Sequence, residues 1–152
     1  MGEDKKERAL EWLRFAKNDL AVATHLSEVF RPLPENTICW LCQQSVEKAL
    51  KAILAYHNAK IKKIHDIGLI LKETTKLESS VSLDDKIAAK ITIFAVESSY
   101  PDNVFDFTKE DTQFGLKYAE LILDQVKQTL NITEEELVQL ESLHQPPTNP
   151  PS

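Results

Sequence analysis

Residues Cys39 to Leu54 read CWLCQQSVEKALKAIL, and after a short loop His65 and Asp66 begin another helical pattern. On a helix, small and apolar residues of this stretch recur at spacings of three and four, and they are Cys42, Ser45, Val46, Ala49, Ile53 and Tyr56. Such a stripe packs into the core of a helical bundle. The stretch also carries polar residues that this periodicity does not explain, namely Gln44, Glu47, Lys48 and Lys51. It therefore predicts a core helix that also bears a polar site.

The composition of the whole chain favours one all-α domain. The 152 residues are 42% apolar, which is enough for a single core without metals or disulfides. The three Gly and seven Pro leave long stretches free of helix breakers. We expect a helical domain over 1–144 and a disordered, Pro-rich tail over 145–152. The charged N-terminus and the lack of a long apolar run predict a soluble, cytoplasmic protein without membrane contact.

The apolar periodicity predicts five or six helices. They cover residues 5–28, about 37–56, 67–76, 82–97 and about 109–130, and a sixth opens after Thr133 with three Glu. Leu69 and Leu121 belong to the apolar faces of this prediction, and Phe15 and Val22 widen the apolar stripe of the first helix. The predicted N-caps are Asn36 or Thr37, Asp66, Ser82 and Thr108.

Charge is distributed unevenly along the chain. The net charge is −6, but residues 1–64 hold eleven Lys and Arg against eight Asp and Glu, and residues 65–152 hold seven against sixteen. The net negative charge argues against a dominant nucleic-acid surface. Loop residues Arg31, Lys60, Lys62 and Lys63 could form a local basic patch that contacts phosphate, or they could be solvated.

Cys39 and Cys42 have the spacing of redox and zinc sites. A zinc site needs further ligands, which His57 or His65 would have to supply, and a thioredoxin-like site needs a strand before the helix. Because both cysteines lie in an apolar helical pattern, we predict that they pack in the core. No metal or cofactor is expected.

Two further segments have both a structural and a functional interpretation. Asp66 can cap a helix while His65 satisfies a carbonyl group, or His65 can lie beside Lys48 or Tyr100 and there bind phosphate or move a proton. The segment Tyr100-Pro101-Asp102 predicts a rigid turn, or the rim of a ligand groove that is completed by a second copy.

Several of these segments together resemble the HEPN family of small helical domains. The matching residues are Asp19 and Ala23, the stretch 42–52, His65 and Asp66 with Leu69 and Leu71, and Tyr100-Pro101-Asp102, in the same order and spacing over about residues 8–130. The resemblance implies an up-and-down bundle of four main helices with one or two short extra helices. It also implies a homodimer and, in many relatives, a minimal nucleotidyltransferase partner in a toxin–antitoxin pair.

Many HEPN proteins resemble metal-independent RNases that use an Arg followed four to six residues later by a His. None of the arginines here, Arg8, Arg14 and Arg31, precedes a His at that spacing. Ser99 occupies the position where the most similar subgroup has an Arg before the turn. A serine hydroxyl cannot replace a guanidinium on phosphate. The departure predicts a protein without the usual catalytic motif.

Three interpretations remain open from the sequence. The leading one is a non-catalytic module that binds nucleotide or RNA, or a nucleotidyltransferase partner. Its ligand-binding residues would be Gln44, Lys48, Lys51, His65, Asp66, Ser99, Tyr100 and Asp102. The second is an active RNase toxin in which His65 is the base and Lys48 or Lys51 replaces arginine. The third is a structural scaffold for dimerisation.

Overall fold

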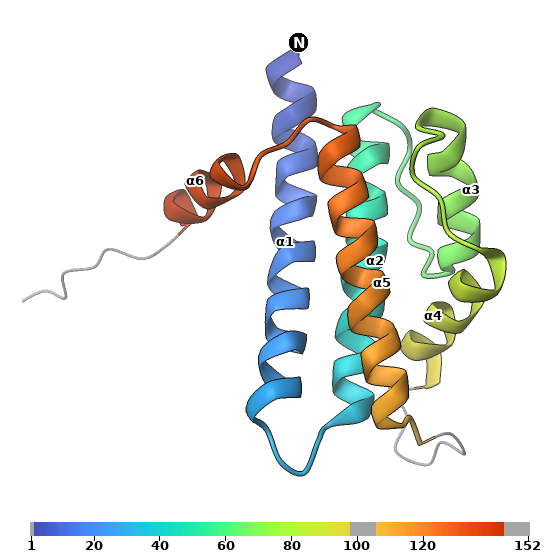
Figure 1. Ribbon diagram of the computed structural model, residues 1–152. Coiled ribbons are helices and arrows are strands. Elements are labelled where there is room, and N and C mark those ends of the chain that lie inside the picture. The colour runs from blue at the N-terminus through green and yellow to red at the C-terminus, as the bar shows by residue number, and fades with distance from the viewer. Residues whose placement is uncertain (1, 98–105, 145–152) are drawn as a thin grey trace, which may run out of the picture.

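The chain folds into a bundle of helices, as its periodicity predicts. A computed structural model describes residues 2–97 and 106–144, and within these ranges it contains helices and no strand (Figure 1). The helices are α1 (Gly2–Val29), α2 (Glu35–Tyr56), α3 (Ile67–Leu77), α4 (Asp85–Glu97), α5 (Lys109–Thr129) and α6 (Glu134–His144). The long helices α1, α2 and α5 lie side by side, the shorter helices α3 and α4 pack against α2, and the short helix α6 packs against α1 (Figure 1).

Helix α2 is the centre of the bundle. It contacts α1, α3, α4 and α5, and 14 of its 22 residues are buried, so only a narrow strip of the helix faces solvent. The predicted stripe is fully buried from Cys42 to Ile53, and its last member, Tyr56, is partly buried. The buried hydroxyl group of Ser45 is satisfied, because the Ser45 Oγ donates to the Ala16 carbonyl of α1 at 2.8 Å.

Helices α2 and α5 approach each other closely at Gly115. A Cβ added there would lie 3.0 Å from the Cys42 Cβ and 3.4 Å from the Phe94 ring. These contacts involve a helix-anchored Cβ and a buried ring, neither of which moves without shifting its helix. A larger side chain at this crossing would therefore push the two helices apart by a few tenths of an ångström or more.

The predicted caps of α3 and α5 are confirmed, and α6 has a cap that was not predicted. The Asp66 Oδ1 accepts from the Leu69 N–H at 3.1 Å. Thr108 and Asp111 form a reciprocal capping box at the start of α5. Thr133 makes the same exchange with Glu136 at the start of α6, since each backbone N–H donates to the other side chain. These caps satisfy backbone donors that have no partner inside the helix.

The predicted starts of α2 and α4 are wrong. Helix α2 begins at Glu35 without a side-chain cap, because the Asn36 Oδ1 instead accepts from the Phe107 N–H at 3.2 Å. Helix α4 begins at Asp85 and not at Ser82. The preceding segment buries Val81 fully and donates the Ser82 N–H to the Gln125 side chain of α5, so it stays extended. In both cases a contact with a distant helix takes the group that would have made the local cap.

Four apolar residues that were predicted to face the core are exposed. Phe15, Val22, Leu69 and Leu121 keep 47%, 51%, 50% and 42% of their surface accessible. Phe15 and Val22 are seven residues apart and therefore share one side of α1. The predicted apolar stripes are therefore wider than the faces that pack.

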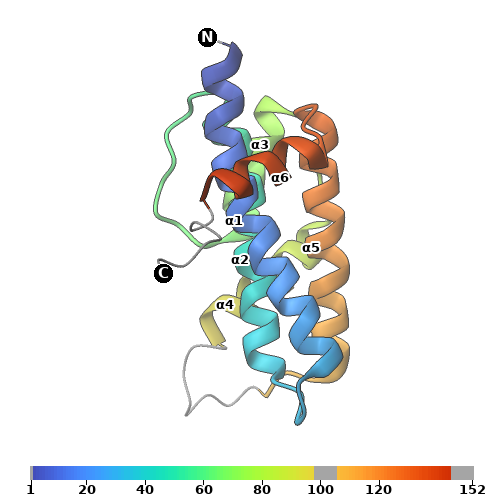
Figure 2. The ribbon, with the colours of Figure 1, turned by 90° about the vertical axis from the view of Figure 1, so that its left-hand side faces the viewer.

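The C-terminal acidic helix α6 crosses over α1 (Figure 2). Leu137 anchors it in the core, Lys6 pairs with Glu136 at 2.9 Å, and Lys17 pairs with Glu134 and Glu141 at 3.6 Å. None of the described helices has the length and apolar character needed to cross a membrane. The predicted turn at 98–103 and the predicted tail at 145–152 lie outside the described residues.

The close crossing at Gly115 gives a test of the packing. Gly115→Val should lower the free energy of unfolding by about 2 kcal/mol, because the added methyl groups overpack the contact with Cys42 and Phe94. The exposed substitution Glu120→Val on the same helix should cost only about 0.5 kcal/mol. Urea unfolding followed by circular dichroism measures both. Equal effects of the two substitutions would show that the crossing can relax.

Candidate functional site

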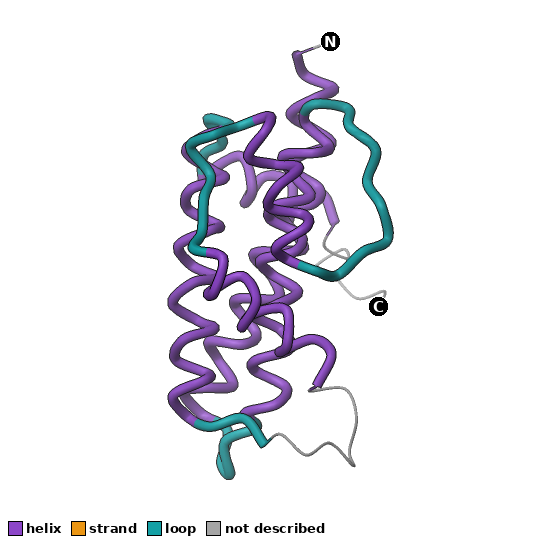
Figure 3. Tube along the Cα trace, turned by 90° about the vertical axis from the view of Figure 1, so that its right-hand side faces the viewer, coloured by secondary structure: helices purple, strands orange, loops and turns teal. Residues whose placement is uncertain are grey.

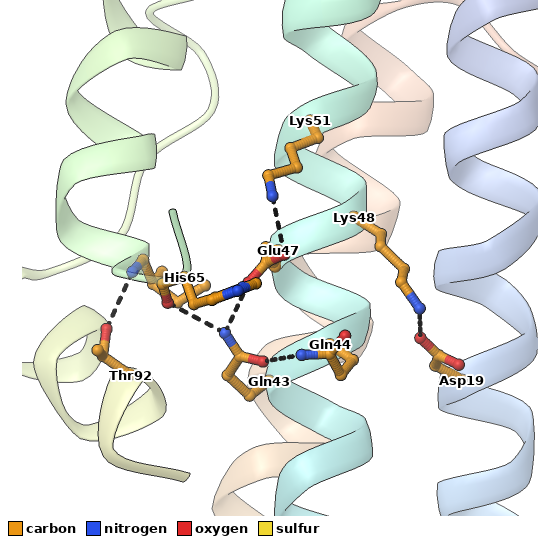
Figure 4. Close-up of polar contacts among 9 residues, drawn as sticks. Asp19, Gln43, Gln44, Glu47, Lys48, Lys51, His65 and Thr92 are labelled. Carbon is orange, nitrogen blue, oxygen red and sulfur yellow. Dashed lines mark hydrogen bonds and ion pairs between the residues drawn. The ribbon is translucent and has the colours of Figure 1, made fainter. Parts of the chain in front are cut away.

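A buried carboxylate on α2 organises the main polar cluster of the protein. The Glu47 Oε1 accepts from the Gln43 side chain at 3.1 Å and faces the His65 Nδ1 at 2.8 Å (Figure 4). Its Oε2 accepts from the Lys51 ammonium group at 2.9 Å. We call Gln43, Glu47, Lys51 and His65 the Glu47 network. Three of its members come from one face of α2, and the fourth comes from the loop before α3.

The network fixes the loop that precedes α3. This loop, residues 57–66, stands out from the bundle before it returns to α2 (Figure 3). The Gln43 side-chain Nε2 donates to the backbone carbonyl of His65 at 3.2 Å. The Gln43 side-chain Oε1 accepts from the Gln44 side-chain Nε2 at 2.7 Å. On the other side, the Ile67 N–H donates to the Thr92 hydroxyl of α4 at 3.0 Å. His65 is therefore positioned by contacts with two helices.

Charge and burial in the network favour an ionised Glu47. Its side chain is only 5% exposed. Burial alone would raise the pKa of Glu47, but the hydrogen bonds from Lys51, His65 and Gln43 and the charge of Lys51 together hold this pKa below its ordinary value. The buried carboxylate is thus matched by donors and by one ammonium group.

The His65 ring is both oriented and accessible. Its side chain is 64% exposed although its Nδ1 lies against buried Glu47. Because a carboxylate faces Nδ1, the neutral ring carries its proton there and leaves Nε2 as an acceptor. No described residue forms a hydrogen bond with the Nε2 of His65. The network therefore presents to solvent one nitrogen that can accept a proton or a hydrogen bond.

Both lysines that were predicted to bind ligand are paired with carboxylates. Lys51 is buried against Glu47, and its ammonium group lies 5.9 Å from the centre of the Trp12 ring. Lys48 contacts Asp19 of α1 at 2.7 Å and lies 5.8 Å from the centre of the exposed Phe15 ring. Neither lysine offers a free positive charge in this arrangement.

The structure brings together part of the predicted site. Gln44 joins the network through Gln43, and Lys51 and His65 belong to it directly. Lys48 lies at the same level of α2 but points toward α1, where it pairs with Asp19 (Figure 4). Asp66 caps α3 beside His65. Ser99, Tyr100 and Asp102 lie outside the described residues.

Gln43 and Glu47 hold the site together, but neither is among the predicted ligand-binding residues, although the sequence pattern had marked Glu47 as one of the polar residues that periodicity does not explain. The spacing of these residues in the sequence could have identified them. Gln43, Glu47 and Lys51 follow one another at intervals of four, which places them on one helical face, and a Glu four residues before a Lys is a favourable pair.

The cysteines have a packing role, as predicted. Both are fully buried, and burial raises the pKa of Cys42 to about 12 and raises the pKa of Cys39 further. Thiols in this state are protonated and unreactive near neutral pH. Among the described residues, no group of three or more His, Cys, Asp or Glu side chains is arranged to hold a metal ion.

The loop cations do not form one basic patch. Arg31 lies between α1 and α2, whereas Lys60, Lys62 and Lys63 follow the opposite end of α2. Helix α2 has 22 residues and is therefore about 33 Å long. One patch that includes Arg31 and the three lysines is therefore excluded, because this helix separates Arg31 from the others.

Comparison with known proteins identifies relatives of this bundle. The sequence model of the HEPN domain family matches residues 9–129. TT1696 from Thermus thermophilus superposes with a TM-score of 0.66 and 23% identity, covering 80% of this chain and 98% of the other. ST0689, an archaeal HEPN homologue, gives a TM-score of 0.59 and 22% identity, with coverage of 81% and 98%. No curated protein matches.

The fold and the network define a small helical-bundle protein with a polar site on its central helix. The family model covers most of the chain, and the chain belongs to the HEPN domain family. At 22–23% identity, the two solved structures establish the fold alone.

The Glu47 network predicts a characteristic pattern of stabilities. Lys51→Met should lower the free energy of unfolding by about 3 kcal/mol, because it leaves a buried carboxylate without its cation. Adding Glu47→Leu should restore most of this loss, because the charge that needed compensation is gone. Lys48→Met breaks a more exposed pair and should cost about 1 kcal/mol or less. Denaturant unfolding of the wild type and these three variants measures the values; a double variant that is no more stable than Lys51→Met would contradict the pairing.

The lowered pKa of Glu47 also predicts a pH dependence. A carboxylate whose pKa is lower in the folded state stabilises the protein above its unfolded value of 4.5, and this contribution disappears as pH falls through the folded pKa. The wild type should therefore lose stability relative to Glu47→Gln as pH falls from 6 to about 3. Urea unfolding at several pH values measures the difference between the two proteins. A difference that does not change with pH would show that Glu47 does not titrate as described.

Proposed function

We propose that this HEPN domain is a non-catalytic module that binds a protein partner through the face of α1 and α2 beside the Glu47 network. The observation that carries this proposal is the neutralisation of Lys48 and Lys51 by Asp19 and Glu47. An oriented, exposed imidazole remains, but no free cation of the network accompanies it. This charge arrangement suits a protein surface better than a phosphate backbone.

Exposed aromatic residues border the polar groups of this face. Phe15 lies against Lys48 and keeps 47% of its surface exposed. Trp40, Gln44 and Lys48 follow one another at intervals of four along α2, and Trp40 is 39% exposed. We call Phe15, Trp40, Gln44, Lys48 and His65 the α1/α2 face. Aromatic residues beside hydrogen-bonding groups are the composition of protein interfaces and of their energetic centres.

The same contacts argue against the RNase alternative. Hydrolysis of RNA through the 2′-hydroxyl group needs a base and a cation that offsets charge on the phosphate. His65 could act as the base. Lys48 and Lys51 would each have to leave a carboxylate before they could act as the cation.

The class of partner comes from the family resemblance. The resemblance implies two partners that could bind the α1/α2 face. One is a minimal nucleotidyltransferase, and the other is a second copy of this chain. Both are proteins, and both would cover the exposed aromatic residues.

A cleavage assay tests the absence of catalysis. Purified protein should not cleave labelled single-stranded RNA in EDTA, and His65→Ala and Lys48→Ala should behave like the wild type. Cleavage by the wild type that disappears in His65→Ala would overturn the proposal and establish an RNase without the usual arginine.

Titration calorimetry with a minimal nucleotidyltransferase tests partner binding. Phe15→Ala and Trp40→Ala should each weaken binding by about tenfold or more, because they remove buried aromatic contacts. Leu77→Ala on α3 and Leu121→Ala on α5 are suitable controls, since these apolar residues are 39% and 42% exposed and belong to other helices. Binding that is unaffected by the first pair would contradict the proposed face. Sedimentation equilibrium of the same variants shows whether a second copy occupies it instead.

A further inference from the structure

We propose a second binding site, for a small organic oxyanion, at the end of the bundle where α1 ends and α5 begins. A surface pocket of about 330 Å³ lies there, and we call it the end pocket. Its principal lining residues are Arg31, Leu33, Glu35, Lys109, Gln113 and Leu116. They come from the α1–α2 loop and the first turns of α2 and α5, at the lower end of the bundle in Figure 1. None of them belongs to the Glu47 network.

Arg31 is held in place with half of its guanidinium group unused. Its Nη1 donates to the carbonyl groups of Ser27 at 3.3 Å and Phe30 at 2.7 Å, at the C-terminal end of α1. No described residue accepts from its Nε or Nη2. These two nitrogens form the edge of the group that binds a carboxylate or phosphate through two parallel hydrogen bonds. The backbone contacts fix Arg31 before any ligand arrives, which lowers the entropic cost of binding.

Two further side chains of α5 supply donors to the same pocket. Lys109 and Gln113 are one helical turn apart, and within the described part of the chain neither side chain has a hydrogen-bond or ion-pair partner. Glu35 contributes the single negative charge of the lining. With Arg31 and Lys109, the lining carries a net charge of about +1, which suits a ligand with one negative charge.

The remaining lining makes the pocket partly apolar. Leu33 and Leu116 are partly buried against the core and leave some of their surface toward the pocket. A volume of about 330 Å³ is at the lower end of the range for small-molecule sites. The ligand class is therefore a short apolar body that carries one carboxylate or phosphate group.

A second surface pocket provides an internal comparison. It lies between α3 and α4, has a volume of about 480 Å³, and is lined in part by Lys72, Lys76 and Asp85. It has a similar balance of charge but no guanidinium group. Its lysines are therefore the matched control for a general attraction of anions to surface cations.

Titration calorimetry with three probes of equal chain length tests the site. Hexanoate or hexyl phosphate should bind to the wild type at least tenfold more tightly than 1-hexanol, and the tighter of the two anions identifies the preferred oxyanion. Arg31→Ala should weaken binding of that anion by at least tenfold. Arg31→Lys should weaken it less, because lysine keeps the charge but loses the two-pronged contact. The Lys72→Ala/Lys76→Ala variant should bind as the wild type does.

Three results would overturn the proposal: no binding of either anion, equal binding of anion and alcohol, or equal losses in the Arg31 and Lys72/Lys76 variants. Circular dichroism checks that each variant is folded. Should Arg31→Ala unfold because α1 loses its terminal contacts, Lys109→Ala decides the question, with an expected loss of at least threefold. Partner binding through the α1/α2 face should not change in these variants.

Discussion

The buried carboxylate of Glu47 is the constraint around which the centre of this protein is arranged. A charge at this depth has to be compensated, and the chain does so with Lys51 one turn later, Gln43 one turn earlier and the ring of His65 from a different segment. The last contact reaches beyond α2. It brings the end of the long loop back to the middle of the bundle, where Asp66 caps α3. The start of α3, and through Thr92 its alignment with α4, follow from satisfying one side chain on α2.

Stability alone does not account for such a network. A buried ion pair commonly contributes less than a well-packed apolar pair of similar volume, because two charges lose their hydration. What the network provides is position: an exposed imidazole whose orientation is set by buried groups. The neutralised lysines limit what that imidazole can do, since no cation of the network is left to stabilise a phosphate. The same contacts therefore place a polar surface and favour recognition over catalysis.

The fold was largely predictable, because helix periodicity and end signals act over a few residues. The stripe on α2 and the caps at Asp66 and Thr108 are features of this kind. The starts of α2 and α4 were not predictable, because each depends on a hydrogen bond to a residue far away in sequence. Asn36 accepts from Phe107, just before α5, and Ser82 donates to Gln125 of α5. The same distinction between local and long-range contacts applies to the candidate site. The pairing of Glu47 with Lys51 follows from helical spacing, whereas Lys48 with Asp19 and His65 with Glu47 join residues 29 and 18 positions apart.

The two cysteines have a consequence for how motions of this protein can be followed. Both thiols are enclosed by neighbouring helices, and burial keeps them protonated. A thiol reagent can react only after α2 separates from its neighbours, because no smaller movement exposes sulfur on its inner side. Cys42 lies against α5 at Gly115, so its labelling requires these two helices to part. The natural chain thus contains its own chemical probe for opening of the bundle, at the one helix that all the main elements contact.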